Sequence, residues 1–391
     1  HIINVSLLIN DRFLLRSAYK LQARTISAVS AESSIQQKLE HDVRTSECSP
    51  SNHNDSHVGK VYVVPKTAEK AVFSWKDLPK MLHDDVEIFG ETFFLIRKPA
   101  VEIISYLNQT DYNRPMNKYV IYGKPGTGKT RTLLHLLHYA YEKKFLLFYV
   151  PWPQLWFKFP KEVTYIEEKD MIDLPVEGGK WLQLFKNQNM QLLEELNITI
   201  SRDYMWSQRE SSDKGTSLME IIDFGINRIK YASNVIEALI HELKLASNKG
   251  KCKVFVAIDG FNAFLSDHTQ IKNPEKKFVP AEQVTLSNIF INITHTDWCN
   301  GATVITVDQL ATKTKRDSEL PLYLLGEKGF EILDPFIPIN VSNYDDNEFS
   351  TIMEYYKERK FIRDITSNGQ QELKIISGCN ALDLLLACKP L

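Results

Sequence analysis

Residues 121–130, IYGKPGTGKT, combine residue types that bind phosphate. Residues 123–130 match Gly-x-x-x-x-Gly-Lys-Thr without deviation, between an apolar run that predicts a strand and an amphipathic run that predicts a helix. Glycines let the backbone turn tightly, so its N–H groups approach phosphate oxygens. Lys129 supplies a point charge for the outer phosphates, and Thr130 a hydroxyl for Mg²⁺. The segment therefore predicts a nucleotide-binding loop.

The contacts of this loop extend along its whole length. The start of the following helix directs its positive end at the same anion, and the proline stiffens the turn. Lys124 and Arg131 either add charge to the site or are solvated surface residues. The predicted nucleotide-binding residues are Gly123, Lys124, Pro125, Gly126, Thr127, Gly128, Lys129, Thr130 and Arg131.

An acid that can complete a magnesium site follows the apolar run KVFVAI. Asp259 ends this predicted strand, as a Walker B aspartate does, and would bind Mg²⁺ together with Thr130. The alternative is an ordinary strand-end aspartate, and the intact loop upstream favours the metal role. Many motor-type ATPases carry a second acid at the next position, where it polarises the attacking water. Here that residue is Gly260, and no other acid lies within six residues of Asp259.

No residue is assigned a catalytic role with certainty. Gln309, at the end of the apolar run GATVITVDQL, either contacts the γ-phosphate or a water, or is a plain polar strand end. The guanine-reading motif Asn-Lys-x-Asp does not occur, so motifs do not distinguish GTP or GDP from ATP. The sequence therefore predicts a nucleotide-binding protein with Mg²⁺ as cofactor and weak or absent hydrolysis, and leaves open whether it is an enzyme.

Other residue pairs with metal-ligand spacing have few companions. His135 and His138 are three apart on the helix after the loop, and His295 and Cys299 are four apart. We interpret LLHLLH as a packed helix face. The five cysteines are scattered without a Cys-x-x-Cys, which favours a reducing compartment over a disulfide framework.

The order of the predicted elements indicates an α/β fold. A strand, a helix and a strand over 117–150 predict a right-handed parallel crossover, and runs apolar at every position predict central parallel strands. Ser217 and Glu220 form a predicted capping box at the start of one long helix that ends near Gly250. We expect an AAA-like P-loop core over 116–312, its parallel sheet flanked by helices, and a small helical C-terminal lid domain over 313–391.

The first 115 residues divide into three predicted parts. Residues 1–30 carry basic residues four apart with apolar and hydroxyl residues between, which favours a mitochondrial presequence over an amphipathic helix of the mature protein. The chain begins with His1, so the true start is open. Residues 31–60 are predicted to be a polar linker with little fixed structure, and 61–115 a small α/β lead-in.

Composition limits the partners. The formal net charge is −2 over 391 residues, so any contact with RNA must use local patches or neighbouring proteins. The longest apolar stretch, FLLFYVPWPQLWF, is interrupted by two prolines, and we expect no membrane span.

With these residues in place, the chain resembles the death-associated protein three family, the P-loop protein of the mitochondrial ribosome's small subunit. The resemblance extends from about Val86 to Leu391. It rests on RKPAVEIISYL, IYGKPGTGKT, RESSDKGTSL, VAIDGFNAF, LLGEKGFEILDPFIPINVSNYDDNEF and EYYKERKF. The family also has Gly after the Walker B aspartate, so Gly260 is no departure.

The resemblance implies a bound guanine nucleotide and a place in the head of the small subunit of the mitochondrial ribosome. The implied partners are mitochondrial ribosomal proteins, small-subunit rRNA, and the large subunit through intersubunit bridges, in the mitochondrial matrix. It also implies a link to apoptosis. Three hypotheses follow: a structural ribosomal protein that holds a nucleotide, a working ATPase or GTPase switch of the AAA or signalling type, and an apoptotic adaptor.

Overall fold

A five-stranded parallel sheet forms the centre of the protein. The computed structural model describes residues 43–73, 79–314, 317–363 and 365–389, and the predicted presequence lies outside these residues. The strand order is β11-β3-β10-β9-β4, and each neighbouring pair is parallel. The strand bounds are β3 Asn117–Tyr122, β4 Phe145–Val150, β9 Lys253–Ile258, β10 Gly301–Thr306 and β11 Ile337–Asn340.

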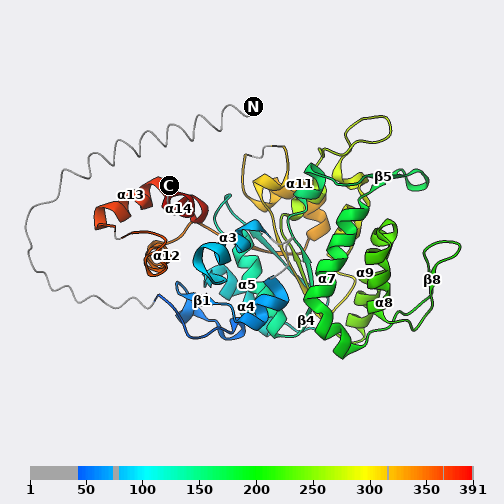
Figure 1. Ribbon diagram of the computed structural model, residues 1–391, viewed down its shortest axis with the longest axis horizontal. Coiled ribbons are helices and arrows are strands. Elements are labelled where there is room, and N and C mark those ends of the chain that lie inside the picture. The colour runs from blue at the N-terminus through cyan, green and yellow to red at the C-terminus, as the bar shows by residue number, and fades with distance from the viewer. Residues whose placement is uncertain (1–42, 74–78, 315–316, 364, 390–391) are drawn as a thin grey trace, which may run out of the picture. The chain divides into compact units, whose positions relative to one another are not determined.

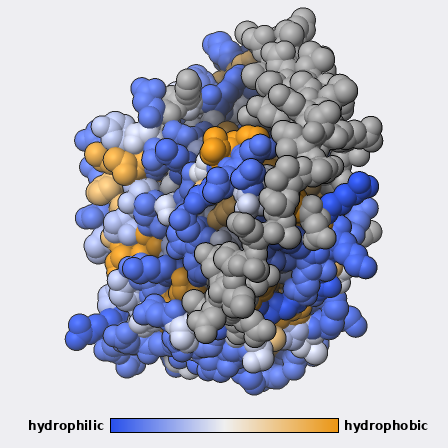
Figure 2. All heavy atoms as spheres, turned by 90° about the vertical axis from the view of Figure 1, so that its left-hand side faces the viewer, coloured by the Kyte–Doolittle hydropathy of each residue, from blue (hydrophilic) through white to orange (hydrophobic). Residues whose placement is uncertain are grey.

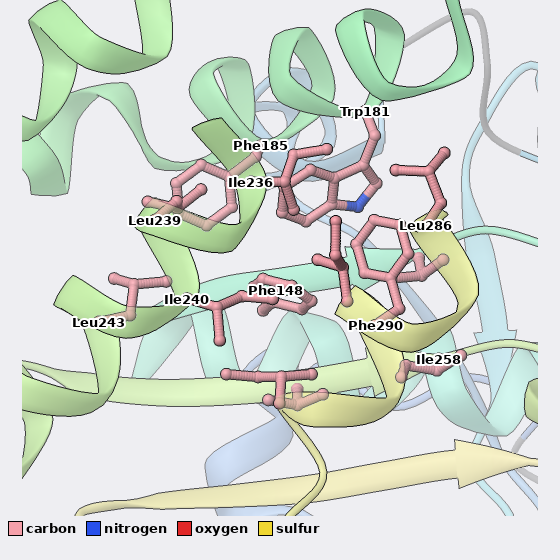
Figure 3. Close-up of a cluster of buried hydrophobic side chains, with 14 of the residues drawn as sticks. Phe148, Trp181, Phe185, Ile236, Leu239, Ile240, Leu243, Ile258, Leu286 and Phe290 are labelled. Carbon is pink, nitrogen blue, oxygen red and sulfur yellow. The ribbon is translucent and has the colours of Figure 1, made fainter. Parts of the chain in front are cut away.

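Alternation along the strands sends apolar side chains into two separate cores. In β4, Leu146, Phe148 and Val150 join one buried cluster, whereas Phe145, Leu147 and Tyr149 join the other. A strand that is apolar at every position can therefore be buried on both faces, as the sequence predicted. Figure 3 shows the first core, where Phe148 lies among Trp181, Phe185 and Phe290 from the covering helices.

Helices cover both faces of the sheet (Figure 1). The helix after the glycine-rich loop packs with its neighbour on one face, and a group of four helices packs on the other. The first pair is α4 Lys98–Gln109 and α5 Lys129–Glu142, and the second group is α7 Pro175–Leu196, α8 Leu218–Asn227, α9 Ala232–Asn248 and α10 Thr285–Asn292. The predicted α/β fold, an AAA-like P-loop core with a flanked parallel sheet and a helical C-terminal part, is confirmed.

The predicted long helix from Ser217 to Gly250 is two helices, so that expectation is wrong. The chain leaves the helical conformation at Arg228 (φ −123°, ψ 67°), which separates α8 from α9. A Cβ at Gly225 would lie 2.6 Å from Leu182 and 2.9 Å from Val235, so this glycine lets α8 pack closely against α7 and α9. Ser217 is the N-cap and accepts a hydrogen bond from Met219 N at 3.3 Å, but among the described residues Glu220 makes no return bond to Ser217 N, so the predicted capping box is only half formed.

The expectation that residues 31–60 lack fixed structure is wrong for the described part, 43–60. Two short 3₁₀ helices, Pro50–Asn52 and Asp55–His57, form here, and Pro50 and His53 are buried. Local side-chain caps such as Asn54 satisfy the turns, and Ser49 Oγ donates to Glu142 of α5 at 2.6 Å. Polar turn residues therefore supply a strap that packs on the loop helix.

The C-terminal part contributes one strand to the central sheet. β11 lies next to β3, and α11 Pro321–Leu333 precedes it. The last helices pack on a third buried cluster with β1 Val61–Val63 and β2 Phe93–Leu95. They are α12 Asp346–Glu358, α13 Ser367–Ser377 and α14 Ala381–Cys388. The side of the molecule that carries them is mostly hydrophilic, with small separate apolar areas (Figure 2).

The remaining elements are short. α3 Lys80–Phe89 precedes β2, which pairs antiparallel with β1. Two small hairpins lie in the aromatic-rich segment between β4 and α8. These remaining elements are α2 Lys66–Ala68, the π-helix Glu69–Phe73, α6 Gln154–Lys158, β5 Thr164–Ile166, β6 Met171–Asp173, β7 Tyr204–Met205 and β8 Ser211–Ser212, with short 3₁₀ helices at Glu167–Lys169, Ile229–Tyr231, Phe261–Leu265, Ala281–Gln283 and Gln309–Ala311.

Candidate nucleotide site

The glycine-rich loop connects the carboxyl end of β3 to the first residue of α5. Its glycines adopt positive φ, 146° at Gly123 and 81° at Gly126. A Cβ at Gly123 would lie 2.3 Å from Val341 O, and one at Gly126 would lie 2.5 Å from Asn380 Oδ1. Only glycine combines these backbone angles with so close an approach of other segments. The loop therefore has the shape its sequence predicted, with the N-terminus of α5 behind it.

Lys129, the first residue of α5, is buried against the loop. Its Nζ donates to Gly123 O and to Lys124 O, both at 2.8 Å, and forms an ion pair with Asp308 Oδ2 at 2.7 Å. The side chain is 4% exposed. The cation is thus fixed by the backbone of its own loop, where it can meet the outer phosphates of a nucleotide.

Thr130 and Asp259 meet as the sequence predicted. Thr130 Oγ1 lies 2.9 Å from Asp259 Oδ2, and Thr306 Oγ1 donates to Asp259 Oδ1 at 2.6 Å. Burial raises the pKa of Asp259 to about 6, while the hydrogen bonds from Thr306 and Thr130 oppose the rise. A hydroxyl and a carboxylate in contact at the phosphate end of a loop are the ligands that Mg²⁺ takes in P-loop proteins. These residues therefore fit the ion.

The fold adds Asp308, to which the sequence analysis gave no role. Parallel strands β9 and β10 are neighbours, so Asp259 and Asp308 emerge at the same edge of the sheet. Asn262 holds the backbone of Asp308: its Nδ2 donates to Asp308 O at 2.8 Å, and its Oδ1 accepts from Asp308 N at 3.1 Å. The position of Asp308 at a strand end beside the Walker B strand was the available signal.

Arg97 was also missed, because its partners are distant in sequence. Its Nη1 donates to Thr127 O of the loop at 2.8 Å, and its Nε and Nη2 donate to the two carboxylate oxygens of Glu348 at 2.9 and 2.8 Å. Both side chains of the ion pair are less than 8% exposed. This residue connects the lead-in segment, the loop and α12.

The other predicted loop residues differ in their contacts and in their exposure to solvent. Arg131 forms an ion pair with Asp85 of α3 and donates to Phe93 O at 3.3 Å, so its charge is directed at the lead-in segment. The side chain of Lys124 is exposed. Thr127 Oγ1 donates to Lys124 O at 3.0 Å, and Pro125 O accepts from Asn380. Within the loop, the main-chain carbonyls are therefore largely engaged by neighbouring side chains.

A cavity of about 430 Å³ continues from the loop between α3, α12 and α14. Its lining includes Lys129, Thr130, Asp259 and Asp308 at one end and Tyr344, Tyr356 and Leu385 elsewhere. Asp308 and Leu310 line it, whereas Gln309 is not among its lining residues in the described chain. At the loop, Leu382 N donates to Gly126 O at 3.0 Å and Asn380 Nδ2 to Pro125 O at 2.9 Å. Charge at one end and an apolar flank are what a nucleotide needs.

The histidines of α5 contact protein groups. His135 Nε2 lies 2.9 Å from His53 Nδ1, and His138 Nδ1 lies 3.2 Å from the hydroxyl of Tyr62. Burial lowers the pKa of His138 to about 4 and that of His135 well below its ordinary value. In the described ranges no three His, Cys, Asp or Glu residues are grouped to hold a metal. The pair therefore belongs to the packing between the strap and α5.

Comparison with known proteins places the chain in a family. A family model described as mitochondrial ribosomal death-associated protein 3 matches residues 94–387. The chain belongs to this family. The small ribosomal subunit protein mS29 of Mus musculus is 34% identical over 353 residues, which cover 89% of this chain and 89% of that protein. The Bos taurus protein of the same name is 36% identical over 344 residues, 86% of this chain and 85% of that protein. The predicted family is confirmed.

Solved structures of low identity resemble parts of the chain. A Walker-type ATPase of Pyrococcus abyssi has a TM-score of 0.42 and 13% identity, over 74% of this chain and 65% of that one. The FIGL-1 AAA domain has a TM-score of 0.35 and 11% identity, over 84% and 72%. We base the fold on the sheet order and the loop described above. Among the described residues, no helix combines the length and apolar character that crossing a bilayer requires.

Proposed function

We propose that the protein is a structural component of the small subunit of the mitochondrial ribosome, and that it holds a guanine nucleotide with Mg²⁺ while hydrolysing it slowly or not at all. In this role it supports mitochondrial translation in the matrix. Its partners are mitochondrial ribosomal proteins, small-subunit rRNA, and the large subunit through intersubunit bridges. The ribosomal part of the proposal is supported by the family and by relatives named for the small subunit that align over nearly the whole chain.

The observation that carries the nucleotide part is the convergence of Lys129, Thr130 and Asp259 at one end of the cavity. Backbone N–H groups of the loop and Lys129 would hold the phosphates, and Thr130 and Asp259 would hold Mg²⁺, which neutralises phosphate charge. The purine ring of the nucleotide would lie along the apolar flank of the cavity, beside Tyr344 and Tyr356. The preference for guanine over adenine is supported by the family resemblance.

Slow turnover is supported by Gly260 and by the state of Asp308. A P-loop enzyme needs a group that orients the attacking water, and glycine cannot do so. Asp308 is the acid that the fold brings nearest, which favours a second candidate function, an active ATPase or GTPase. Its carboxylate, however, is already engaged by Lys129 and by Leu310 N at 2.7 Å. A carboxylate engaged in this way is not free to orient a water molecule.

Sedimentation tests the ribosomal role. Mitochondrial lysate is separated on a sucrose gradient, and the endogenous protein is followed with the small-subunit rRNA. Co-migration with small subunits that survives high salt is the expected result. A protein that instead sediments as a free homo-oligomer contradicts the structural role and favours the AAA-type ATPase.

Single-turnover hydrolysis tests the enzymatic part. Purified protein with labelled GTP or ATP and Mg²⁺ should turn over on the order of once per hour or more slowly, as unassisted P-loop proteins do. Asp259→Asn and Asp308→Asn are the matched carboxylate variants, and Gln309→Ala tests the predicted candidate. A wild-type rate above about one per second that is lost in Asp308→Asn would identify Asp308 as a base and the protein as an enzyme.

The pro-apoptotic role is proposed on the family alone. It is tested by expressing Lys129→Ala in cells depleted of the wild-type protein and measuring caspase activation. Equal activation by wild type and variant would separate the apoptotic role from nucleotide binding.

A further inference from the structure

Five lysines surround an open hollow of about 830 Å³ on a part of the protein that the nucleotide site does not use. They are Lys143, Lys144, Lys249, Lys251 and Lys253, and all five side chains are exposed. Glu195 is the one acid among the lining residues of this hollow. The hollow therefore carries a local surplus of four positive charges, five minus one, on a chain whose formal net charge is −2. We call it the lysine basin.

The lysine basin lies at the amino ends of the parallel strands. Phe145 and Lys253 are the first residues of β4 and β9, and Gly301 is the first of β10. The glycine-rich loop, Asp259 and Asp308 follow the carboxyl ends of the same sheet. A strand of six residues is about 20 Å long, so the basin and the nucleotide site lie at opposite ends of the strands of one sheet. Occupation of one leaves the other free.

Most of the charge in the basin is not neutralised by acids. Lys144 pairs with Glu195 at 3.5 Å, between two exposed side chains. Lys143 lies beside the carboxylate of Glu142, where burial raises the pKa and the charge of Lys143 opposes that rise, and among the described residues Lys249, Lys251 and Lys253 form no ion pair with a carboxylate. Lys253 Nζ instead lies 4.4 Å from the ring centre of Tyr112, which holds its charge at the rim. Lys249, Lys251 and Lys253 are three exposed cations close together without a carboxylate partner, and they repel one another and so favour an anionic ligand.

The preference for cations at helix C-termini accounts for only some of the lysines in the basin. Lys143 and Lys249 cap the C-termini of α5 and α9, where a cation suits the helix dipole. Lys251 and Lys253 lie beyond α9, in the turn and at the start of β9, and no helix end requires them. The framework below them is fixed: Ser247 Oγ donates to Cys299 O at 2.6 Å, and Asn300 Nδ2 to Cys252 O at 2.7 Å.

We propose that the lysine basin binds the phosphate backbone of structured RNA. This inference rests on the proposed ribosomal function, because RNA is the polyanion that a small-subunit protein meets. Exposed lysines act as point charges on phosphates without reading sequence, and duplex RNA is recognised mainly by its shape and backbone. The basin thus anchors the protein on RNA at the amino ends of the strands, at the end of the sheet opposite the nucleotide site.

The test compares two triple variants of the full chain. Lys249→Gln/Lys251→Gln/Lys253→Gln removes three charges from the basin and keeps the length of each side chain. Lys272→Gln/Lys276→Gln/Lys277→Gln removes three exposed charges from a loop at the other edge of the sheet. Binding of a fluorescein-labelled RNA duplex of about 20 base pairs is followed by anisotropy between roughly 50 and 200 mM KCl.

The basin variant should bind the duplex at least roughly tenfold more weakly, and its log–log salt slope should be smaller by about two to three. The control should change affinity less than about twofold, and both should melt and bind GTP like wild type. Equal losses in the two variants, or a wild type that does not bind the duplex, would overturn the proposal. Equally tight binding of polyglutamate in the basin would overturn RNA in favour of an acidic protein.

The sedimentation experiment and the duplex-binding experiment together separate this inference from the proposed function. A wild-type protein that sediments with small subunits but does not bind the duplex keeps the ribosomal role and refutes the lysine basin. A protein that binds the duplex through the basin, yet sediments apart from small subunits, keeps the basin and refutes the ribosomal role.

Discussion

The Nζ of Lys129 lies 2.7 Å from Oδ2 of Asp308, and the two side chains are only 4% and 10% exposed. Lys129 comes from the loop after β3, and Asp308 from the end of the adjacent strand β10. The cation that a P-loop offers to phosphate is therefore already neutralised by an internal anion. A bound nucleotide must share Lys129 with this carboxylate or displace it.

We expect Asp308→Asn to strengthen nucleotide binding, and triphosphate binding more than diphosphate binding. The γ-phosphate would approach the carboxylate most closely, and like charges within about 6 Å oppose each other. The amide keeps the cap on Leu310 N. Calorimetry with Mg²⁺ should show triphosphate affinity rising roughly tenfold, about 1.4 kcal/mol, whereas the exposed Asp267→Asn changes nothing. Weaker binding by Asp308→Asn would mean that the carboxylate is a ligand of Mg²⁺.

Lys129→Ala should abolish nucleotide binding and also destabilise the nucleotide-free protein. It removes the phosphate-binding charge and leaves the buried carboxylate of Asp308 without its partner, which costs about 3 kcal/mol or more. Lys129→Ala/Asp308→Asn should regain most of that stability and still not bind nucleotide. Chemical denaturation and calorimetry measure the two effects separately. A double variant as unstable as Lys129→Ala would refute the unpaired charge as the cause.

Arg97→Met should destabilise the protein by about 3 to 5 kcal/mol, because it leaves Glu348 buried and unpaired. It should also weaken nucleotide binding, because the loop loses the hydrogen bond to Thr127 O. The matched control is Lys328→Met, which breaks the exposed pair with Glu282 and should cost less than about 1 kcal/mol. Similar losses of unfolding free energy in the two variants, measured by urea unfolding, would contradict the proposal that the buried Arg97–Glu348 pair stabilises the protein.

The buried histidines predict a stability that depends on pH. Burial lowers the pKa of His138 from 6.5 to about 4. Between these values the unfolded chain binds a proton that the folded chain does not. The contribution is therefore fully present above about pH 6.5 and is lost as the pH falls toward 4, at about 1.4 kcal/mol per pH unit.

His138→Gln keeps a partner for the hydroxyl of Tyr62 and removes the titrating group. The free energy of unfolding, measured in urea between pH 7 and 5, should fall less steeply in this variant. The exposed His268→Gln should keep the wild-type slope. Equal slopes for wild type and His138→Gln would show that His53 and His135, whose pKa values burial also lowers, carry the titration instead, since the raised pKa of Glu142 contributes with the opposite sign.

Sequence alone predicted the elements whose signals are local. The loop, the strands of continuous apolar residues and the meeting of Thr130 with Asp259 follow from motifs and periodicity. Asp308 and Arg97 were missed because their partners lie in other elements. The strand order brings Asp308 to Lys129, whereas the packing of α12 on the lead-in segment brings Glu348 to Arg97. The break between α8 and α9 falls at Arg228, inside a stretch whose apolar residues keep helical spacing, so periodicity gave no sign of it. The strap over 43–60 is polar in composition, and it is ordered by contacts with α5.

The nucleotide loop receives its last hydrogen bonds from Asn380 and Leu382, more than 250 residues after it in the chain. During synthesis the loop and then the Walker B strand emerge before Asn380 and Leu382, which cover the loop. The unfinished protein thus lacks one wall of the site. Firm retention of the proposed nucleotide would then require that residues 380–382 have been made and have folded onto the loop, so an assembly step that needed the nucleotide would admit only such molecules.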